Sequence, residues 1–211
     1  MGDPGVLRHL LDVSAARRQP KRPDRAAMQR AVKYFLVAAG LDPADPNLTQ
    51  TPERVTEAWA DEFLDGYGRT AASVLGERFP VSTASDREVV VVTELWFRSM
   101  CPHHLLPYSG RAHLAYVPGK AVIGFGRLAA LVDLFAHRLV LQEELARQVC
   151  AALMTELGSQ GAACILEAEQ TCLRLRGGEQ CDAVTHAEAY DGVLKEPGLR
   201  SELWARLGRR A

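Results

Sequence analysis

The first part of the chain spaces its apolar residues as a helix does, from residue 26 to about residue 78. Met28, Val32 and Leu36 recur at the interval that places side chains on one helical face. A second helix is expected near Thr51, a capping residue followed by Pro52 at the first helical position. The pattern therefore predicts N-terminal helices over this segment.

The part of the chain after residue 88 alternates between strand-like and helix-like patterns. The expected elements are a strand at 89–97, a turn at 108–110, a strand at 111–117, helices around 128–135 and 141–157, and strands at 163–176 and 183–190. Two strands, two helices and two strands in this order predict an α+β fold, an antiparallel sheet with helices on one face. Because such a sheet has open edges, closure by self-association is expected.

Pattern and composition divide the chain into four segments. Residues 1–25 are rich in Arg, Pro and Ala and are expected to form a flexible basic tail. The helical region follows at 26–78, and the strand-rich domain that carries the chemistry spans 79–195. Residues 196–211 are expected to form a C-terminal helix or tail.

Composition is that of a soluble globular protein, with 47% hydrophobic residues and a net charge of −1. A net charge near zero argues against a general nucleic-acid binder. No apolar run is long enough to cross a bilayer, and the N-terminus lacks a signal-peptide pattern. Five cysteines, an odd number, argue against a disulfide framework. We therefore expect a cytoplasmic protein without membrane or nucleic-acid partners.

Candidate metal ligands stand in the loop Cys101-Pro102-His103-His104. The offset between Cys101 and His104 lets one short loop offer a thiolate and an imidazole to the same ion. Cys172 lies in an alternating run and is expected on a neighbouring strand as a third ligand. Three protein ligands leave a fourth position open, as in catalytic zinc sites, although ferrous iron accepts the same donors. The alternative is two buried thiols beside a polar turn.

The residues from Ser99 to about Gly192 resemble the GTP cyclohydrolase I family. The zinc loop of that family reads Ser-[Met/Thr]-Cys-Glu-His-His, and here Ser99-Met100 precede the candidate ligands. Further matches are Thr51–Val55, Tyr116–Pro118, Val122–Gly124, Arg138, Gln142-Glu143, Cys172 and Arg176-Gly177. The resemblance covers roughly residues 28–195. It implies the tunnelling fold, in which antiparallel sheets from several subunits close into a barrel with helices outside, and a homodecamer with active sites between subunits.

The resemblance also implies a reaction, the hydrolysis of the imidazole ring of GTP to 7,8-dihydroneopterin triphosphate and formate. Zinc on Cys101, His104 and Cys172 would activate water, and His103 matches the proton-transfer histidine of the family. The remaining matches concern substrate binding: Gln142 and Glu143 for the guanine edge, and Arg176, Arg127 and Arg54 for the triphosphate. Without the resemblance, these would be a solvated helix start and surface arginines.

Three departures from the family pattern bear on the expected chemistry. Gln170 replaces a family histidine two residues before the distal cysteine, and glutamine does not exchange protons at neutral pH. Pro102 replaces a glutamate, and Ala130 replaces an arginine of the triphosphate site. His186 would replace the lost imidazole if its strand pairs beside Cys172, although a strand histidine is more often packed or solvated.

These departures leave alternatives to the full reaction on GTP. One is a divergent enzyme that stops at a formamidopyrimidine, or that acts on another purine or a pterin. Another is a non-catalytic assembly that binds a purine or pterin as a ligand.

Overall fold

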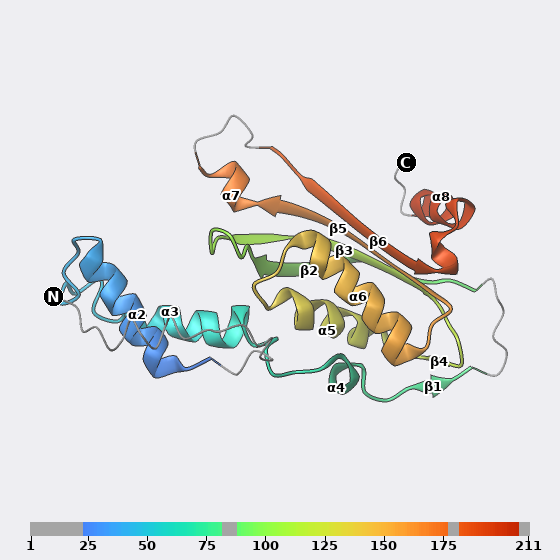
Figure 1. The fold of residues 1–211 in the computed structure, drawn as a ribbon, viewed down its shortest axis with the longest axis horizontal. Helices are drawn as coiled ribbons and strands as arrows, with labels where there is room; N and C mark the ends of the chain where they lie inside the picture. The colour runs from blue at the N-terminus through green and yellow to red at the C-terminus, as the bar shows by residue number, and fades with distance from the viewer. Residues whose placement is uncertain (1–22, 82–87, 177–181, 207–211) are drawn as a thin grey trace, which may run out of the picture.

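A four-stranded antiparallel sheet forms the centre of the molecule in a computed structural model that describes residues 23–81, 88–176 and 182–206 (Figure 1). Its strands are β2 (Val90–Met100), β3 (Pro107–Val117), β5 (Gly161–Gln170) and β6 (Thr185–Gly192). They lie in the order β2-β3-β5-β6, and each neighbouring pair is antiparallel. The predicted α+β class and antiparallel sheet are confirmed. The tail expected at 1–25 falls mostly outside the described residues.

Helices α5 (Phe125–Ala136) and α6 (Gln142–Leu157) cover one face of this sheet (Figure 1). The main core lies between them and the strands, because alternate strand residues turn apolar side chains toward the helices. Leu128 and Leu145 are fully buried there with Phe97 of β2 and Leu166 of β5. Helix α6 ends at Gly158, whose left-handed backbone (φ 65°) is the expected C-terminal cap.

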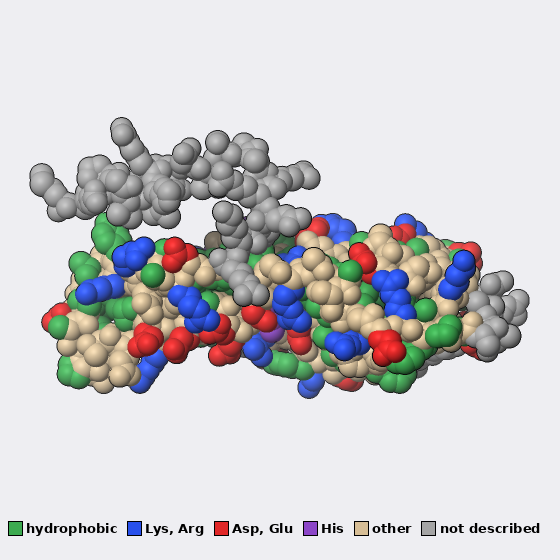
Figure 2. All heavy atoms as spheres, turned by 90° about the horizontal axis from the view of Figure 1, so that it is seen from below, with side chains coloured by type: hydrophobic (Ala, Val, Ile, Leu, Met, Phe, Trp, Pro, Cys, Tyr) green, Lys and Arg blue, Asp and Glu red, His purple; other side chains and the backbone are tan. Residues whose placement is uncertain are grey.

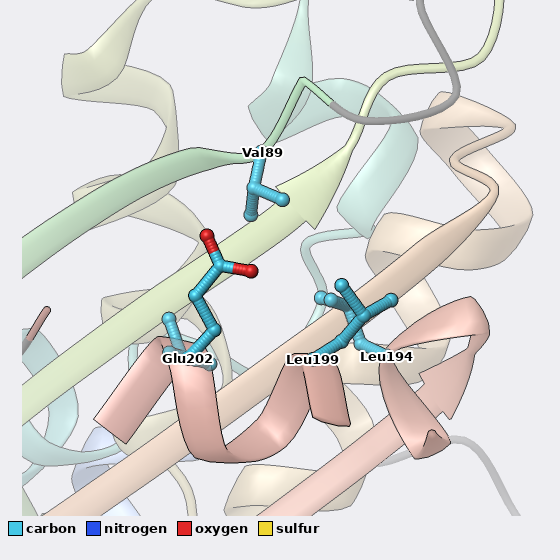
Figure 3. A pocket seen from close by; sticks show the side chains of 5 residues that line it. Val89, Leu194, Leu199 and Glu202 are labelled. Carbon is cyan, nitrogen blue, oxygen red and sulfur yellow. The ribbon is translucent and has the colours of Figure 1, made fainter. Parts of the chain in front are cut away.

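The opposite face of the sheet is also partly covered, which corrects the expectation of helices on one face only. The 3₁₀ turn η2 (Val193–Lys195) and helix α8 (Pro197–Arg206) lie there. Figure 3 shows Leu194, Leu199 and Glu202 of this segment near Val89, around a void of about 10 Å³. A second apolar cluster, which includes Ile165 and Leu203, fills this contact. The strand ends are apolar on both sides, so both sides require a cover.

The N-terminal helices are α2 (Arg25–Ala38) and α3 (Thr51–Ala58), followed by the π-helix η1 (Trp59–Phe63) and α4 (Ala71–Leu75). Helices α2 and α3 pack on each other and extend away from the sheet (Figure 1). Helices are present near the N-terminus, as the pattern predicts. Thr51 is the first helical residue of α3 rather than its cap, and Gln50 precedes it without a side-chain cap.

The residues after the π-helix bind to the end of α5 through backbone and side-chain contacts. The Gly66 N–H donates to the His137 carbonyl at 3.1 Å. The His137 Nδ1 lies 2.6 Å from the Asp65 Oδ1, and Arg138 donates to the Gly66 carbonyl. These contacts attach the N-terminal helices to the body of the molecule.

Two expected boundaries differ in the structure. Residues 108–110 are not a turn but belong to β3, where Gly110 pairs with Phe97 and Ala168. The third strand ends at Gln170, and Cys172 lies in a short helix, α7 (Thr171–Arg174), rather than on the strand. A small second sheet pairs β1 (Phe79–Pro80) with β4 (Ala121–Val122), and no pattern in the sequence predicts it.

Charged side chains of both signs are interspersed on the face seen in Figure 2, without a large patch of one sign. This distribution accords with the near-zero net charge. Among the helices in the described ranges, none combines the length and the apolar character that crossing a bilayer requires.

Candidate metal centre

The loop that joins β2 to β3 presents three of the candidate residues in a tight turn. The Cys101 N–H donates to the Leu106 carbonyl at 2.9 Å, and the Leu105 N–H donates back to the Cys101 carbonyl at 2.9 Å. Leu105 has a positive φ of 54°, a conformation that this closure imposes on a residue with a side chain. Cys101 is buried, whereas His103 and His104 are exposed at the tip.

Strand pairing brings the distant cysteine to this loop. Tyr108, near the start of β3, pairs with Gln170 at the end of β5, so the chain after β5 emerges beside the loop. The Thr171 hydroxyl donates to the Pro107 carbonyl at 2.5 Å and fixes the first residue of α7. Cys172 then turns toward Cys101 and His104 from the short helix rather than from a strand.

The ligand atoms of Cys101, His104 and Cys172 all lie within 4.8 Å of one another. The Cys101 Sγ is 3.7 Å from the His104 Nδ1. Ligands on a tetrahedral zinc, with bonds of about 2.0–2.3 Å, are separated by about 3.5–3.8 Å. The trio therefore fits such an ion after a small contraction, and it leaves one position open. In the ranges that the structure describes, these residues are the one such group of histidine, cysteine and acidic side chains.

Electrostatics at Cys172 also suit a cation. Burial and the neighbouring Cys101 thiol raise the pKa of Cys172, and the Arg176 charge lowers it in part. Two thiols this close cannot both ionise easily, whereas a bound divalent ion favours both thiolates. Arg176 is exposed four residues after Cys172, and its charge acts on that thiol.

A cleft of about 230 Å³ opens beside the trio. Its lining includes Cys101, His103, His104, Tyr108, Gln142, Glu143, Gln170, Cys172 and Thr185. Glu143 is exposed in the first turn of α6, where the helix dipole favours a carboxylate. Tyr108 is buried beneath the cleft, where its hydroxyl donates to the Val140 carbonyl at 2.9 Å and burial raises its pKa.

Gln142 is buried and makes four hydrogen bonds within the protein. Its amide nitrogen donates to the carbonyls of Leu166 at 3.0 Å and Thr185 at 3.1 Å. Its amide oxygen accepts from the Gln170 amide at 3.0 Å and from the Thr185 hydroxyl at 2.6 Å. The sequence predicts a solvated helix start at Gln142 or, by resemblance, a residue that binds the guanine edge. Within this chain Gln142 is instead buried and hydrogen-bonded to residues of β5 and β6.

Three other residues that were predicted for the site lie away from the cleft of their own chain. Arg54 donates to the Gln50 side chain at 2.5 Å on α3, and Arg127 donates to the Val74 carbonyl at 3.5 Å beside α4. His186 faces Glu167 at 3.6 Å on the opposite side of the sheet. The period-two alternation of β6 turns Thr185 into the cleft and His186 away from it, so His186 does not pair beside Cys172.

Two residues of the cleft were missed from the sequence. The sequence pattern predicts a turn at Tyr108, and it predicts a strand that contains Thr185 without giving that residue a role. Strand alternation places both. Thr185 shares a sheet face with Ala187 and Ala189, which are buried under α6, and Tyr108 shares one with the buried Ala112 and Leu114 of β3. That signal was present in the sequence.

Comparisons with known proteins agree with one another. The family model described as GTP cyclohydrolase I matches residues 28–207. A protein from Leifsonia xyli subsp. xyli named GTP cyclohydrolase 1 is 43% identical over 185 residues, 88% of this chain and 96% of its own length. Proteins of the same name from Deinococcus radiodurans and Chromobacterium violaceum are 38% and 40% identical, covering 87% and 82% of this chain and 83% and 87% of their own lengths.

A solved structure titled as the archaeosine synthase QueF-Like in the apo form is also similar. It is 18% identical, covers 51% of this chain and 97% of its own, and has a TM-score of 0.42. This likeness is too weak to carry a conclusion.

Proposed function

Because the chain belongs to the GTP cyclohydrolase I family, we propose that it hydrolyses the imidazole ring of GTP to 7,8-dihydroneopterin triphosphate and formate. The observation that carries this proposal is the cluster of Cys101, His104 and Cys172 at the mouth of a cleft. The cleft also holds an imidazole, His103, and a carboxylate, Glu143. Proton transfer requires a group such as this imidazole, and recognition of a purine requires an acceptor such as this carboxylate.

Cys101, His104 and Cys172 would hold zinc, since two thiolates and an imidazole are soft donors at suitable separations. A zinc ion held by these residues would lower the pKa of bound water toward neutrality and so would supply a nucleophile. Ferrous iron is the competing ion, and metal analysis of protein purified under anaerobic conditions separates the two.

The residues of the chain have distinct roles in this proposal. His103 projects from the same turn as His104 and moves protons between water and the ring nitrogens. The Glu143 carboxylate accepts hydrogen bonds from N1–H and the 2-amino group of guanine. Arg176, which is exposed four residues after Cys172, binds a phosphate with its planar fork.

Arg54 and Arg127 support an oligomeric site. Both lie away from the cleft of their own chain, and family resemblance puts active sites between subunits. We therefore assign them to the triphosphate site of a neighbouring subunit in a homo-oligomer, a decamer by resemblance. The edge strands β2 and β6 have no strand neighbour on their outer sides among the described residues, and their pairing across subunits would close the tunnelling-fold barrel.

A second candidate function is favoured by Gln170, an amide where the family has an imidazole. With one proton-transfer group fewer, the reaction would stop at the formamidopyrimidine, before loss of formate and closure of the new ring. Binding of a purine or pterin without turnover is the limiting case of this alternative.

One experiment separates these outcomes. Zinc-loaded protein is incubated with GTP, and the mixture is analysed for formate, for a pterin that fluoresces after oxidation, and by mass spectrometry. Formate together with the pterin supports the full reaction, and a formamidopyrimidine without formate supports the second candidate. Recovery of intact GTP, with zinc bound and the protein folded, would falsify both ring-opening reactions, and only the limiting case of binding without turnover would then remain.

A further inference from the structure

The orientation of the Gln170 side chain is fixed by a chain of hydrogen bonds that begins at the backbone. The Leu166 and Thr185 carbonyls can only accept, so the Gln142 atom that faces both of them must be its nitrogen. The Gln142 oxygen therefore faces Gln170, and the Gln170 atom that meets it must be a nitrogen as well. Reversing either amide would place two oxygens 3.0–3.1 Å apart without a hydrogen between them.

The other end of the Gln170 amide is consequently a carbonyl oxygen turned toward the metal ligands. Its Oε1 lies 4.0 Å from the Cys172 Sγ, and Gln170 lines the cleft. Because the nitrogen is held by Gln142, this oxygen cannot be exchanged for a donor without breaking the chain of hydrogen bonds. An imidazole at the same position would either donate or accept, according to its tautomer.

We propose that Gln170 is a fixed hydrogen-bond acceptor that selects ligands carrying an N–H or O–H beside the metal ligands, with Gln142 as its positioning residue. The proposal rests on the proposed function for the identity of the ligand, a guanine nucleotide. It departs from the expectation that Gln142 reads the base, because all four hydrogen-bonding positions of Gln142 are occupied by the protein.

Chemistry identifies the part of the ligand that Gln170 meets. Water must add to C8 of the purine, so C8 and its neighbours N7 and N9 lie next to the metal ligands, and N9 carries the ribose. In GTP, N7 presents a lone pair, which a carbonyl oxygen repels. After water has added, N7 carries a hydrogen and C8 a hydroxyl, and both are donors to Gln170. The fixed acceptor therefore favours the hydrated or opened ring over GTP itself.

Two nucleotides that cannot be hydrolysed in this way serve as probes of zinc-loaded protein. One is 8-oxo-GTP, which carries N7–H, and the other is 7-deaza-GTP, which carries a C–H at that position. Calorimetric titration gives the ratio of their dissociation constants for the wild type and for Gln170→Leu. We expect Gln170→Leu to reduce the preference for 8-oxo-GTP by about three- to tenfold, the usual effect of one neutral hydrogen bond.

Two further variants test the positioning role. Gln142→Leu keeps Gln170 but releases its amide, and should lower the same preference while 7-deaza-GTP binding changes little. Gln148→Leu, on α6 and hydrogen-bonded to Glu144, is the matched control and should leave the preference unchanged. If Gln170→Leu does not fold, Gln170→His carries the test. A neutral imidazole exchanges between two tautomers and is an acceptor toward the ligand in only one of them, so the preference should also fall.

The inference fails if the preference is unchanged in Gln170→Leu or Gln170→His, or if both nucleotides weaken equally in them. A preference that Gln142→Leu leaves intact refutes the positioning role. If neither nucleotide binds the zinc-loaded wild type, the proposed function falls and this inference falls with it. Failure of the inference alone is recognised by nucleotide binding that persists without dependence on residue 170.

Discussion

Replacing Gly110 by alanine should disturb both the sheet and the metal centre, because β3 and β5 approach too closely there for a side chain. A Cβ at this position would lie 1.7 Å from the Glu167 carbonyl oxygen and 2.8 Å from the Ala168 Cα. The nearer contact is 1.3 Å short of the 3.0 Å that real Cβ atoms keep. The opposing atoms are backbone, so no side-chain rotation relieves the clash, and the strands must move apart.

The expected losses of stability and of zinc affinity follow from this separation of β3 and β5. Overpacking costs about 1–3 kcal/mol, and each weakened ladder hydrogen bond adds about 0.5–1.5 kcal/mol. A total of about 3 kcal/mol lowers the midpoint of thermal unfolding by roughly 6–12 °C in a chain of this length. The same movement displaces Cys172 from Cys101, because Gly110 lies only two residues from the Tyr108–Gln170 pair. Zinc affinity should therefore fall by about 10- to 100-fold, as when the support of a ligand is lost.

Circular dichroism of the metal-free protein measures the midpoint, and competition with a chromophoric chelator measures zinc affinity. Gly126→Ala is the control, since a Cβ at this position in the first turn of α5 meets nothing within 4 Å. Alanine there should stabilise the helix by about 0.5–1 kcal/mol and leave zinc binding unchanged. A Gly110→Ala protein that melts with the wild type and binds zinc equally would refute the reasoning about strand approach.

Three other outcomes follow from the structure. Cys172→Ala should lose most of its bound zinc by elemental analysis, whereas Cys150→Ala, which removes a buried thiol outside the cluster, should keep it. Leu203→Ala should lower the unfolding free energy by about 2–4 kcal/mol in urea titrations, because Leu203 is 4% exposed between α8 and the sheet. Burial, with Glu188 beside the hydroxyl, raises the pKa of Tyr190 from 10.0 to about 12. Between pH 10 and about 12 the unfolded state releases the Tyr190 proton while the folded state keeps it. The contribution of Tyr190 to stability is therefore complete below pH 10 and is lost progressively as the pH rises to about 12. Urea titrations at both pH values should show a smaller loss for Tyr190→Phe.

The elements of the fold could be predicted because their periodicity is strong. The apolar spacing of α5 and α6 predicts two helices, and the residue pattern of β2 predicts a strand. Gly110 was assigned to a turn because glycine and serine usually mark one. Here glycine serves the close approach of two strands, which depends on a partner strand far away in the sequence. Local pattern contains no such information.

The metal trio was predicted from residue type and resemblance, and the structure brings its members together. The prediction that Cys172 lies on a strand was wrong. The alternation of polar and apolar residues continues past Gln170, although the strand ends there. A short helix of the length of α7 has too few residues to show a period of its own. The burial of Gln142 was not predicted either, since it depends on carbonyls of β5 and β6 that a helix-start pattern cannot reveal.

The departure at Gln170 affects the chemistry of the centre without affecting its construction. Cys101 and His104 are placed by the closure of a turn, and Cys172 is placed by strand pairing and by the Thr171 hydroxyl. None of these contacts uses the Gln170 side chain, which bonds instead to Gln142. A substitution at residue 170 can therefore change the hydrogen-bonding polarity beside the ion while the ion remains bound. Metal content and the fate of the purine ring are consequently independent measurements for this protein, and zinc binding alone is no evidence that the reaction on GTP runs to completion.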